Sequence, residues 1–153
     1  MTWLDHKIPP PVVGALMGAA MWGVASFGPQ FAWPIAVRFA VVFVLIAAGI
    51  GFDVAGILAF RRAQTTVNPL KPESASALVT GGIYRFTRNP MYVGMVLFLL
   101  AWGAYLDSSV ALVGPLVFML YITRFQIQPE ERALRAAFSA QFEDYSGRVR
   151  RWL

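Results

Sequence analysis

The chain has 153 residues, of which 58% are hydrophobic and 14% are charged, and its net charge is +5. Soluble domains carry about 25% charged residues, so this composition excludes an ordinary soluble domain. The chain has no cysteine, which excludes disulfides, thiolate metal sites and a cysteine nucleophile. Its single histidine, His6, excludes a histidine-rich metal centre and a Ser-His-Asp triad, and no metal site is expected.

Four apolar segments occupy residues 11–27, 33–60, 91–106 and 109–127. A helix that crosses a bilayer needs about 20 apolar residues, so the first and third segments are short for a span. No small-x-small cleavage site follows the first segment, so we interpret it as a retained span and not as a signal peptide. The predicted fold is therefore all-α: one membrane domain over residues 1–153, with four transmembrane helices and a carboxyl-terminal amphipathic helix.

The lysines and arginines predict the orientation. Four spans place both termini on one side, and that side carries every Lys and Arg except Arg38, which would snorkel to the interface from the outer start of the second span. Positive residues collect on the cytoplasmic side. We therefore expect both termini, the middle loop 61–89 and the tail 128–153 to be cytoplasmic, in the cell (inner) membrane. Because topology accounts for the positive charge, no nucleic-acid partner is expected.

The tail predicts an amphipathic helix from Pro129 to about Phe142. Proline suits the first turn of a helix, and Glu130 and Glu131 complement the positive end of its dipole. Apolar residues recur every four positions on one face, which also carries Glu130: Leu134, Phe138 and Phe142. Glu131 stands four residues before Arg135, which predicts an exposed ion pair on the other face.

A polar cluster, GGIYRFTRNPMYVG, precedes the third apolar segment at residues 81–94. Asn89 followed by Pro90 predicts a helix start, because asparagine caps and proline suits the first turn. The opening glycine pair permits close approach of the backbone to a ligand. Alone, the motif could equally be a helix start whose arginines meet lipid phosphates. With the acidic pair of the tail and the ending YSGRVRRWL, it gathers cationic, anionic and aromatic groups, which suits a zwitterionic, partly aromatic cofactor.

These residues resemble a known group of proteins. The motif at 81–94, a helical hairpin, and EERALRAAFSAQFEDYSGRVRRWL at 130–153 are similar to the membrane methyltransferases of the isoprenylcysteine carboxyl methyltransferase and phospholipid methyltransferase group. The group's pattern is a Gly-x-Tyr turn and Arg-His-Pro or Arg-Asn-Pro with Met-Tyr and Gly. After the hairpin follow Glu-Glu, Phe, Tyr and a terminal Arg-Trp. The resemblance covers residues 79–153, and two separated blocks match in order and spacing.

The resemblance implies an enzyme that uses S-adenosylmethionine and releases S-adenosylhomocysteine. The methyl group would go to a lipophilic acceptor, such as a prenylcysteine-like carboxylate, a lipid amine or a thiol. Its partners would be membrane lipid and a lipophilic or lipidated substrate, while the oligomeric state is not predicted. The cofactor would bind in region 79–153, at the cytoplasmic edge. The residues that the resemblance carries over to the cofactor site are Gly81, Gly82, Tyr84, Arg88, Asn89, Pro90, Tyr92, Gly94, Glu130, Glu131, Tyr145 and Arg151.

Three of these residues, Arg88, Asn89 and Glu130, are expected to be catalytic. The cofactor's ammonium suits the carboxylate of Glu130 or Glu131, and its carboxylate suits Arg88, Arg151 or backbone N–H groups of the glycine pair. Asn89 replaces the histidine found in many members of the group; it can donate a hydrogen bond but cannot transfer a proton. Methyl transfer from a sulfonium is an in-line displacement that needs alignment more than proton transfer, so the missing triad is no obstacle.

Several alternatives stay open. Asp53 lies within the second apolar segment, where a carboxylate is costly, so it is either a functional residue or a partner of a cytoplasmic arginine. The chain could also be an NADPH-dependent membrane reductase of related architecture, although such reductases are much longer. A third possibility is a non-catalytic adaptor that presents a basic face to lipids.

Overall fold

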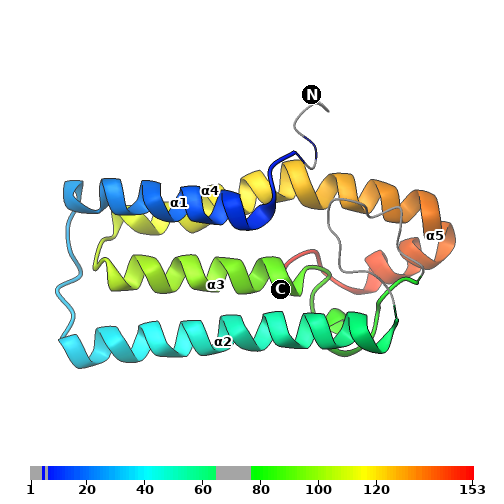
Figure 1. Ribbon diagram of the computed structural model, residues 1–153, viewed down its shortest axis with the longest axis horizontal. Helices are drawn as coiled ribbons and strands as arrows, with labels where there is room; N and C mark the ends of the chain where they lie inside the picture. The colour runs from blue at the N-terminus through cyan, green and yellow to red at the C-terminus, as the bar shows by residue number, and fades with distance from the viewer. Residues whose placement is uncertain (1–4, 6, 65–76) are drawn as a thin grey trace.

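The computed structural model describes residues 5, 7–64 and 77–153, and every regular element in that part is a helix (Figure 1). Four helices run antiparallel in a bundle: α1 (Pro10–Val24), α2 (Ile35–Arg62), α3 (Pro90–Tyr105) and α4 (Val113–Ile122). A fifth, α5 (Gln128–Arg148), extends beyond the end of the bundle and folds back. The all-α prediction is confirmed for the described residues. His6 and residues 65–76 of the middle loop lie outside them.

Three helices of the described part are long and apolar enough to cross a membrane: Pro10–Phe27, Ile35–Arg62 and Val110–Arg148. The predicted third span is α3, which is apolar but has only 16 residues. At 1.5 Å per residue it is about 24 Å long, somewhat less than the hydrocarbon thickness of about 30 Å. Length and composition therefore support three spans, with α3 as a shorter apolar helix among them.

The centre of the bundle is α3, which packs against α1, α2 and α4. Its buried residues include Val93, Leu99 and Ala101. By contrast, α2 packs mainly against α3, and its only buried residues are Gly49 and Gly56. Because these glycines have no side chain, the two backbones approach closely, as at many helix contacts in membranes.

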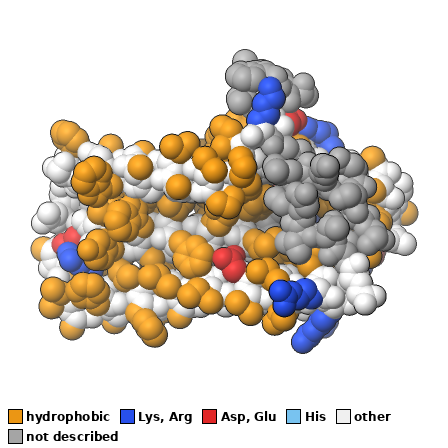
Figure 2. Space-filling view, in the orientation of Figure 1, with side chains coloured by type: hydrophobic (Ala, Val, Ile, Leu, Met, Phe, Trp, Pro, Cys, Tyr) orange, Lys and Arg blue, Asp and Glu red, His pale blue; other side chains and the backbone are white. Residues whose placement is uncertain are grey.

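Large apolar side chains cover the outside of the bundle. Phe43 of α2 and Leu120 of α4 are both 73% exposed. Figure 2 shows hydrophobic side chains along the whole length of the bundle and basic side chains toward its two ends. An apolar surface of this extent needs an apolar environment. This pattern is typical of an integral membrane protein.

Two short connections pair at the end of the bundle opposite α5. The backbones of Gln30 and Ser108 form an isolated bridge, and the N–H of Phe31 donates to the carbonyl of Asp107 at 3.3 Å. Arg38, which the sequence predicts to lie near the interface, is 3.7 Å from the Asp107 carboxylate. The prediction missed this pair because Asp107 comes from the turn after α3, which is remote in the sequence.

The tail differs most from the prediction. It is not a separate helix from Pro129 to Phe142, because α4 continues through one π-helical turn (Thr123–Ile127) directly into α5. The chain changes direction at Ser139, whose φ is +39°, and the helix then resumes as far as Arg148. The predicted end at Phe142 was wrong because the residues after the bend pack against a second hydrophobic core.

Candidate functional site

The second core lies beyond the end of the bundle, where α5 folds back toward the start of α3. Its buried residues are Val79, Tyr84, Phe142 and Tyr145. The hydroxyl of Tyr145 donates to the backbone carbonyl of Tyr84 at 2.8 Å, and the ring of Phe60, from α2, meets Tyr84 edge-on at 5.4 Å. These contacts hold the returning part of α5 against the 3₁₀ turn Gly82–Arg85.

The last residues of the chain bind to the motif that starts α3. The backbone N–H of Arg88 donates to the carbonyl of Arg150 at 3.0 Å, and the side-chain amide of Asn89 donates to the carbonyl of Arg151 at 2.9 Å. Asn89 therefore makes no side-chain cap on α3, contrary to the prediction. Its position at the start of the helix is as predicted, but its amide fixes the chain end.

Glu131 is enclosed by two arginines. Its Oε1 accepts from Arg88 at 2.9 Å and from Arg151 at 2.9 Å, and its Oε2 accepts from Arg151 at 2.7 Å. Glu131 is buried, and its carboxylate raises the pKa of the Arg151 guanidinium. The predicted exposed pair with Arg135 is wrong, because Arg135 pairs with Glu143 across the bend of α5. Both oxygens of Glu131 are thus occupied within the protein.

The neighbouring Glu130 has only one of its carboxylate oxygens hydrogen-bonded among the described residues. Its Oε1 accepts from the Tyr92 hydroxyl at 2.6 Å, and its Oε2 has no hydrogen bond with the described residues. The side chain is partly exposed. Burial raises the pKa of Tyr84 well above its ordinary value, and Tyr145 and Glu130 raise it further. Tyr84 therefore stays protonated at neutral pH near a carboxylate that has bonding capacity left.

The glycines of the motif have different surroundings. Gly82 has a φ of +61°, which favours glycine, and a Cβ on Gly81 would meet nothing within 4 Å. Gly94 instead faces α2, where a Cβ would come within 2.4 Å of Asp53. Pro90 is buried, and its ring lies against Gly56 of α2. The structure therefore brings the tyrosines, Arg88, Asn89, both glutamates and Arg151 to the end of the bundle, whereas Pro90 and Gly94 lie against α2.

Two threonines of the site were missed by the sequence reasoning. Thr87 is fully buried, and its Oγ1 accepts from the N–H of Asn89 at 3.2 Å and donates to the carbonyl of Arg151 at 3.3 Å. Thr123, in the π turn, accepts from the indole N–H of Trp152 at 3.2 Å. A threonine two residues before the residue that precedes a helix is a recognisable local pattern, so Thr87 could have been found, whereas Thr123 has no such signal.

A sequence model of a known family matches residues 37–141, about two thirds of the chain, and its description is Phospholipid methyltransferase. The chain belongs to the phospholipid methyltransferase family. The match extends from α2 into α5 and contains the Arg-Asn-Pro motif and both glutamates. The resemblance noted from the sequence is confirmed.

A protein of Haemophilus influenzae named "Uncharacterized protein" is 43% identical over 63 residues, which are 41% of this chain and 100% of that protein. No solved structure was found to match. The family and the apolar helices together indicate an integral membrane methyltransferase.

Proposed function

We propose that this phospholipid methyltransferase family member transfers a methyl group from S-adenosylmethionine to a lipophilic acceptor, and that the cofactor binds beside Glu130. The observation that carries this proposal is the difference between the two glutamates. Glu131 has both oxygens bound to Arg88 and Arg151, whereas Glu130 keeps one oxygen without a partner among the described residues. A buried ion-pair network and an available carboxylate thus stand side by side.

The charged, aromatic and backbone groups at this end of the bundle match the functional groups of the cofactor. Its ammonium group needs a carboxylate, which Glu130 offers. The rings of Tyr84 and Tyr92 lie near Glu130 and can face a sulfonium or an adenine, because aromatic faces attract cations. Arg88 and Arg151 already bind Glu131, so the backbone near Gly81, which is open to approach, is the better binder for the cofactor's carboxylate.

When bound, the cofactor supplies an electrophilic methyl group. The chain's own residues hold it in place. Arg88 and Asn89, expected from the resemblance to be catalytic, act as positioning residues in this proposal: Arg88 fixes Glu131, and Asn89 fixes the chain end. An in-line displacement mainly requires that the reacting groups are aligned. A rigid network of positioning residues therefore suits this reaction.

The proposal includes the sidedness predicted from the sequence. A water-soluble cofactor reaches the site from the cytoplasm, and the lipophilic acceptor reaches it from the membrane. Most of the arginines of the described chain lie at this end, which favours the cytoplasmic side of the cell membrane.

Calorimetric titration of the detergent-purified protein tests the proposal. We expect saturable binding of S-adenosylmethionine and S-adenosylhomocysteine and none of NADPH. Glu130→Gln should weaken binding of both cofactor forms at least tenfold, because it removes the charge that meets the ammonium. Arg62→Gln, at the exposed end of α2, should leave it unchanged.

The other outcomes decide between the remaining functions. Binding of NADPH alone would overturn the proposal in favour of a reductase. A folded protein that binds none of the three compounds would favour a non-catalytic adaptor. Equal losses in Glu130→Gln and Arg62→Gln would refute the placement of the site.

A further inference from the structure

The end of the bundle opposite the proposed cofactor site carries an ion pair whose bonding is incomplete. Arg38 Nη1 and Asp107 Oδ2 are 3.7 Å apart, which is too far for a hydrogen bond. Arg38 Nε and Asp107 Oδ1 are buried and have no hydrogen-bond partner among the described residues. The two side chains are 26% and 12% exposed, so a small polar group can reach the pair from the surface. Figure 2 shows acidic and basic side chains next to each other at this end of the bundle.

The position of Arg38 is not favoured by its own helix. Arg38 lies at the end of the first turn of α2, near the positive end of the helix dipole, where a cation is unfavourable. A charged group beside an apolar surface also costs free energy unless it is paired and hydrogen-bonded. Asp107 pairs with Arg38 but makes no hydrogen bond with it. An anion from the membrane interface, such as a lipid phosphate, would complete the bonding of this guanidinium.

Aromatic rings connect the ion pair to a pocket between α1 and α3. The Arg38 guanidinium lies 5.7 Å from the centre of the Phe39 ring and 5.9 Å from the centre of the Tyr105 ring. Tyr105 in turn stacks on Trp102, with ring centres 5.4 Å apart and ring planes at 15°. Trp102 lines the pocket. The ring of Tyr105 therefore touches both the ion pair and the pocket wall, and the two form one continuous surface.

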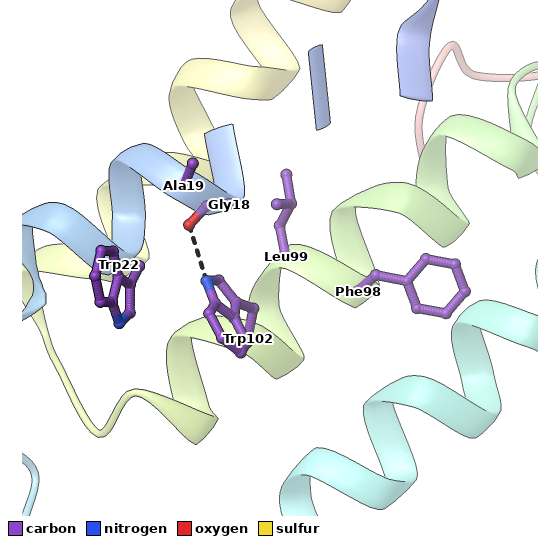
Figure 3. Close-up of a pocket in the computed structure, with 6 residues that line it drawn as sticks. All are labelled: Gly18, Ala19, Trp22, Phe98, Leu99 and Trp102. Atoms are coloured by element: carbon purple, nitrogen blue, oxygen red, sulfur yellow. Dashed lines mark hydrogen bonds between the residues drawn. The ribbon is translucent and has the colours of Figure 1, made fainter. Parts of the chain in front are cut away.

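The pocket is a gap in the packing of the bundle, and its lining is almost wholly apolar. Its volume of about 490 Å³ lies in the range of about 300–1,000 Å³ typical of small-molecule sites. Figure 3 shows Trp102 reaching toward α1, where its indole N–H donates to the carbonyl of Gly18 at 2.9 Å. Trp102 precedes Asp107 by five residues, about 8 Å along a helix, so the pocket lies deeper in the membrane than the ion pair. The residues that line it are Gly18, Ala19, Trp22, Phe98, Leu99 and Trp102.

We propose that this surface binds one phospholipid from the leaflet at this end of the bundle, with its phosphate at Arg38, a primary ammonium at Asp107 and an acyl chain in the pocket. Arginine suits a phosphate, and a carboxylate oxygen without a partner suits an N–H donor. Asp107 repels an anionic head that has no ammonium, and a choline head has no N–H to donate. The surface therefore favours an ethanolamine head.

This lipid is distinct from the methyl acceptor. The ion pair lies beyond the far end of α3, whose 16 residues span about 24 Å from Pro90. A head group held there does not reach the polar residues at the start of α3. The bound lipid instead fills the gap between α1 and α3 and completes the packing of the bundle. The inference therefore does not depend on the proposed function.

Quenching of tryptophan fluorescence by brominated phospholipids tests the inference, because Trp22 and Trp102 line the pocket. The full chain is reconstituted in phosphatidylcholine bilayers that contain increasing fractions of brominated phosphatidylethanolamine, phosphatidylcholine or phosphatidylglycerol. We expect the ethanolamine lipid to bind about threefold more tightly than the other two. Equal quenching by all three lipids would show contact with the bulk bilayer alone and would overturn the inference. A preference for phosphatidylglycerol would overturn the assigned head group.

Two substitutions test the head-group contacts. Asp107→Asn should abolish the preference for phosphatidylethanolamine over phosphatidylcholine, because it removes the charge that meets the ammonium. Arg38→Gln should weaken binding of all three brominated lipids, because all three carry a phosphate. Circular dichroism checks that each variant is folded, and Arg62→Gln, at the other end of α2, should change neither result. A folded Asp107→Asn protein that keeps the preference would refute the inference.

Ala19→Leu is an independent variant that leaves the ion pair intact. Ala19 lines the pocket, and a larger side chain there occupies the space of the acyl chain. Binding of brominated phosphatidylethanolamine should fall about threefold. The control is Ala20→Leu, at a neighbouring exposed position of α1 that does not line the pocket. Equal quenching in the two leucine variants would place the acyl chain outside the pocket, and the inference would be wrong.

Discussion

Two adjacent glutamates at the start of α5 have different hydrogen-bond partners, and single substitutions should separate their contributions. Glu131→Gln leaves Arg88 and Arg151 without their carboxylate at a site where the Glu131 side chain is only 11% exposed. Removal of one partner from a buried ion pair costs about 3–5 kcal/mol, and because Arg151 is partly exposed we expect a loss in free energy of unfolding of about 3 kcal/mol. Thermal unfolding followed by circular dichroism measures it.

The matched control is Glu143→Gln, which breaks an exposed pair with Arg135. Exposed pairs contribute about 0–1 kcal/mol, so this variant should melt close to the unchanged protein. Equal melting of the Glu131 and Glu143 variants would show that the arginine network does not stabilise the fold.

The hydroxyl of Tyr92 holds Glu130 in position, so Tyr92→Phe should weaken cofactor binding without removing any charge. A hydrogen bond to a charged group contributes about 1.5–3 kcal/mol, and about 1.4 kcal/mol corresponds to a tenfold change in affinity. We expect Kd for S-adenosylhomocysteine to rise about tenfold, as measured by calorimetry. Tyr105→Phe, at the opposite end of α3, is the control. An unchanged Kd for Tyr92→Phe would mean that Glu130 needs no such support.

At the level of single residues, the sequence predicted which groups gather at one end of the bundle better than it predicted their hydrogen bonds. The motif and the acidic pair correctly marked the end of the bundle, because local capping and charge patterns are visible in a linear chain. The partners of Glu131 were not predictable, since Arg151 reaches it only after α5 bends at Ser139 and the chain end returns to α3. Pairing across such distances is set by tertiary packing and not by helical periodicity.

The observed helix boundaries agree with the predicted ones where a run of apolar residues sets the length of the helix. The end of α2 at Arg62 and the start of α3 at Pro90 were each predicted within about two residues, the usual uncertainty of helix boundaries. The continuous α4 and α5 were not predicted. The proline pattern predicts the start of a new helix at Pro129, but a proline also fits where a π turn has already altered the hydrogen bonds of the preceding residues.

The contact between α2 and α3 depends on Gly49 and is testable at the level of the helix pair. Gly49→Ala places a methyl group 2.5 Å from the Phe98 ring and 3.1 Å from the carbonyl of Gly94, so the Phe98 ring or one of the two helices must shift. Overpacking of this kind costs about 1–3 kcal/mol. Reversible unfolding of the purified protein in mixed detergent micelles should show that loss.

Gly51→Ala is the control for the same helix, because nothing lies within 4 Å of a Cβ at Gly51. Alanine favours a helix over glycine by about 0.8–1 kcal/mol, so this variant should be as stable as the unchanged protein or slightly more stable. If both alanine variants gain stability, α2 does not pack closely on α3 at Gly49.

The whole molecule combines an apolar bundle with a polar cap at one end. One core lies among α1, α3 and α4, and the second is built by α5 and the turn before α3. The chain end lies at the start of α3, and the chain also enters α1 at that end (Figure 1). The proposed cofactor site and most of the arginines of the described residues therefore lie at the same end of the bundle.

This sidedness can be measured because the chain has no cysteine of its own. Ser26→Cys and Gly147→Cys place single thiols at exposed positions near opposite ends of the bundle. In intact cells, a membrane-impermeant maleimide should label Cys introduced at Ser26 and should reach the one at Gly147 only after permeabilisation. Both thiols should react fully in detergent, which controls for burial. Labelling of Gly147→Cys in intact cells would place the polar cap outside the cell. Cytoplasmic S-adenosylmethionine does not reach that side, so this result would refute both the predicted orientation and the proposed function.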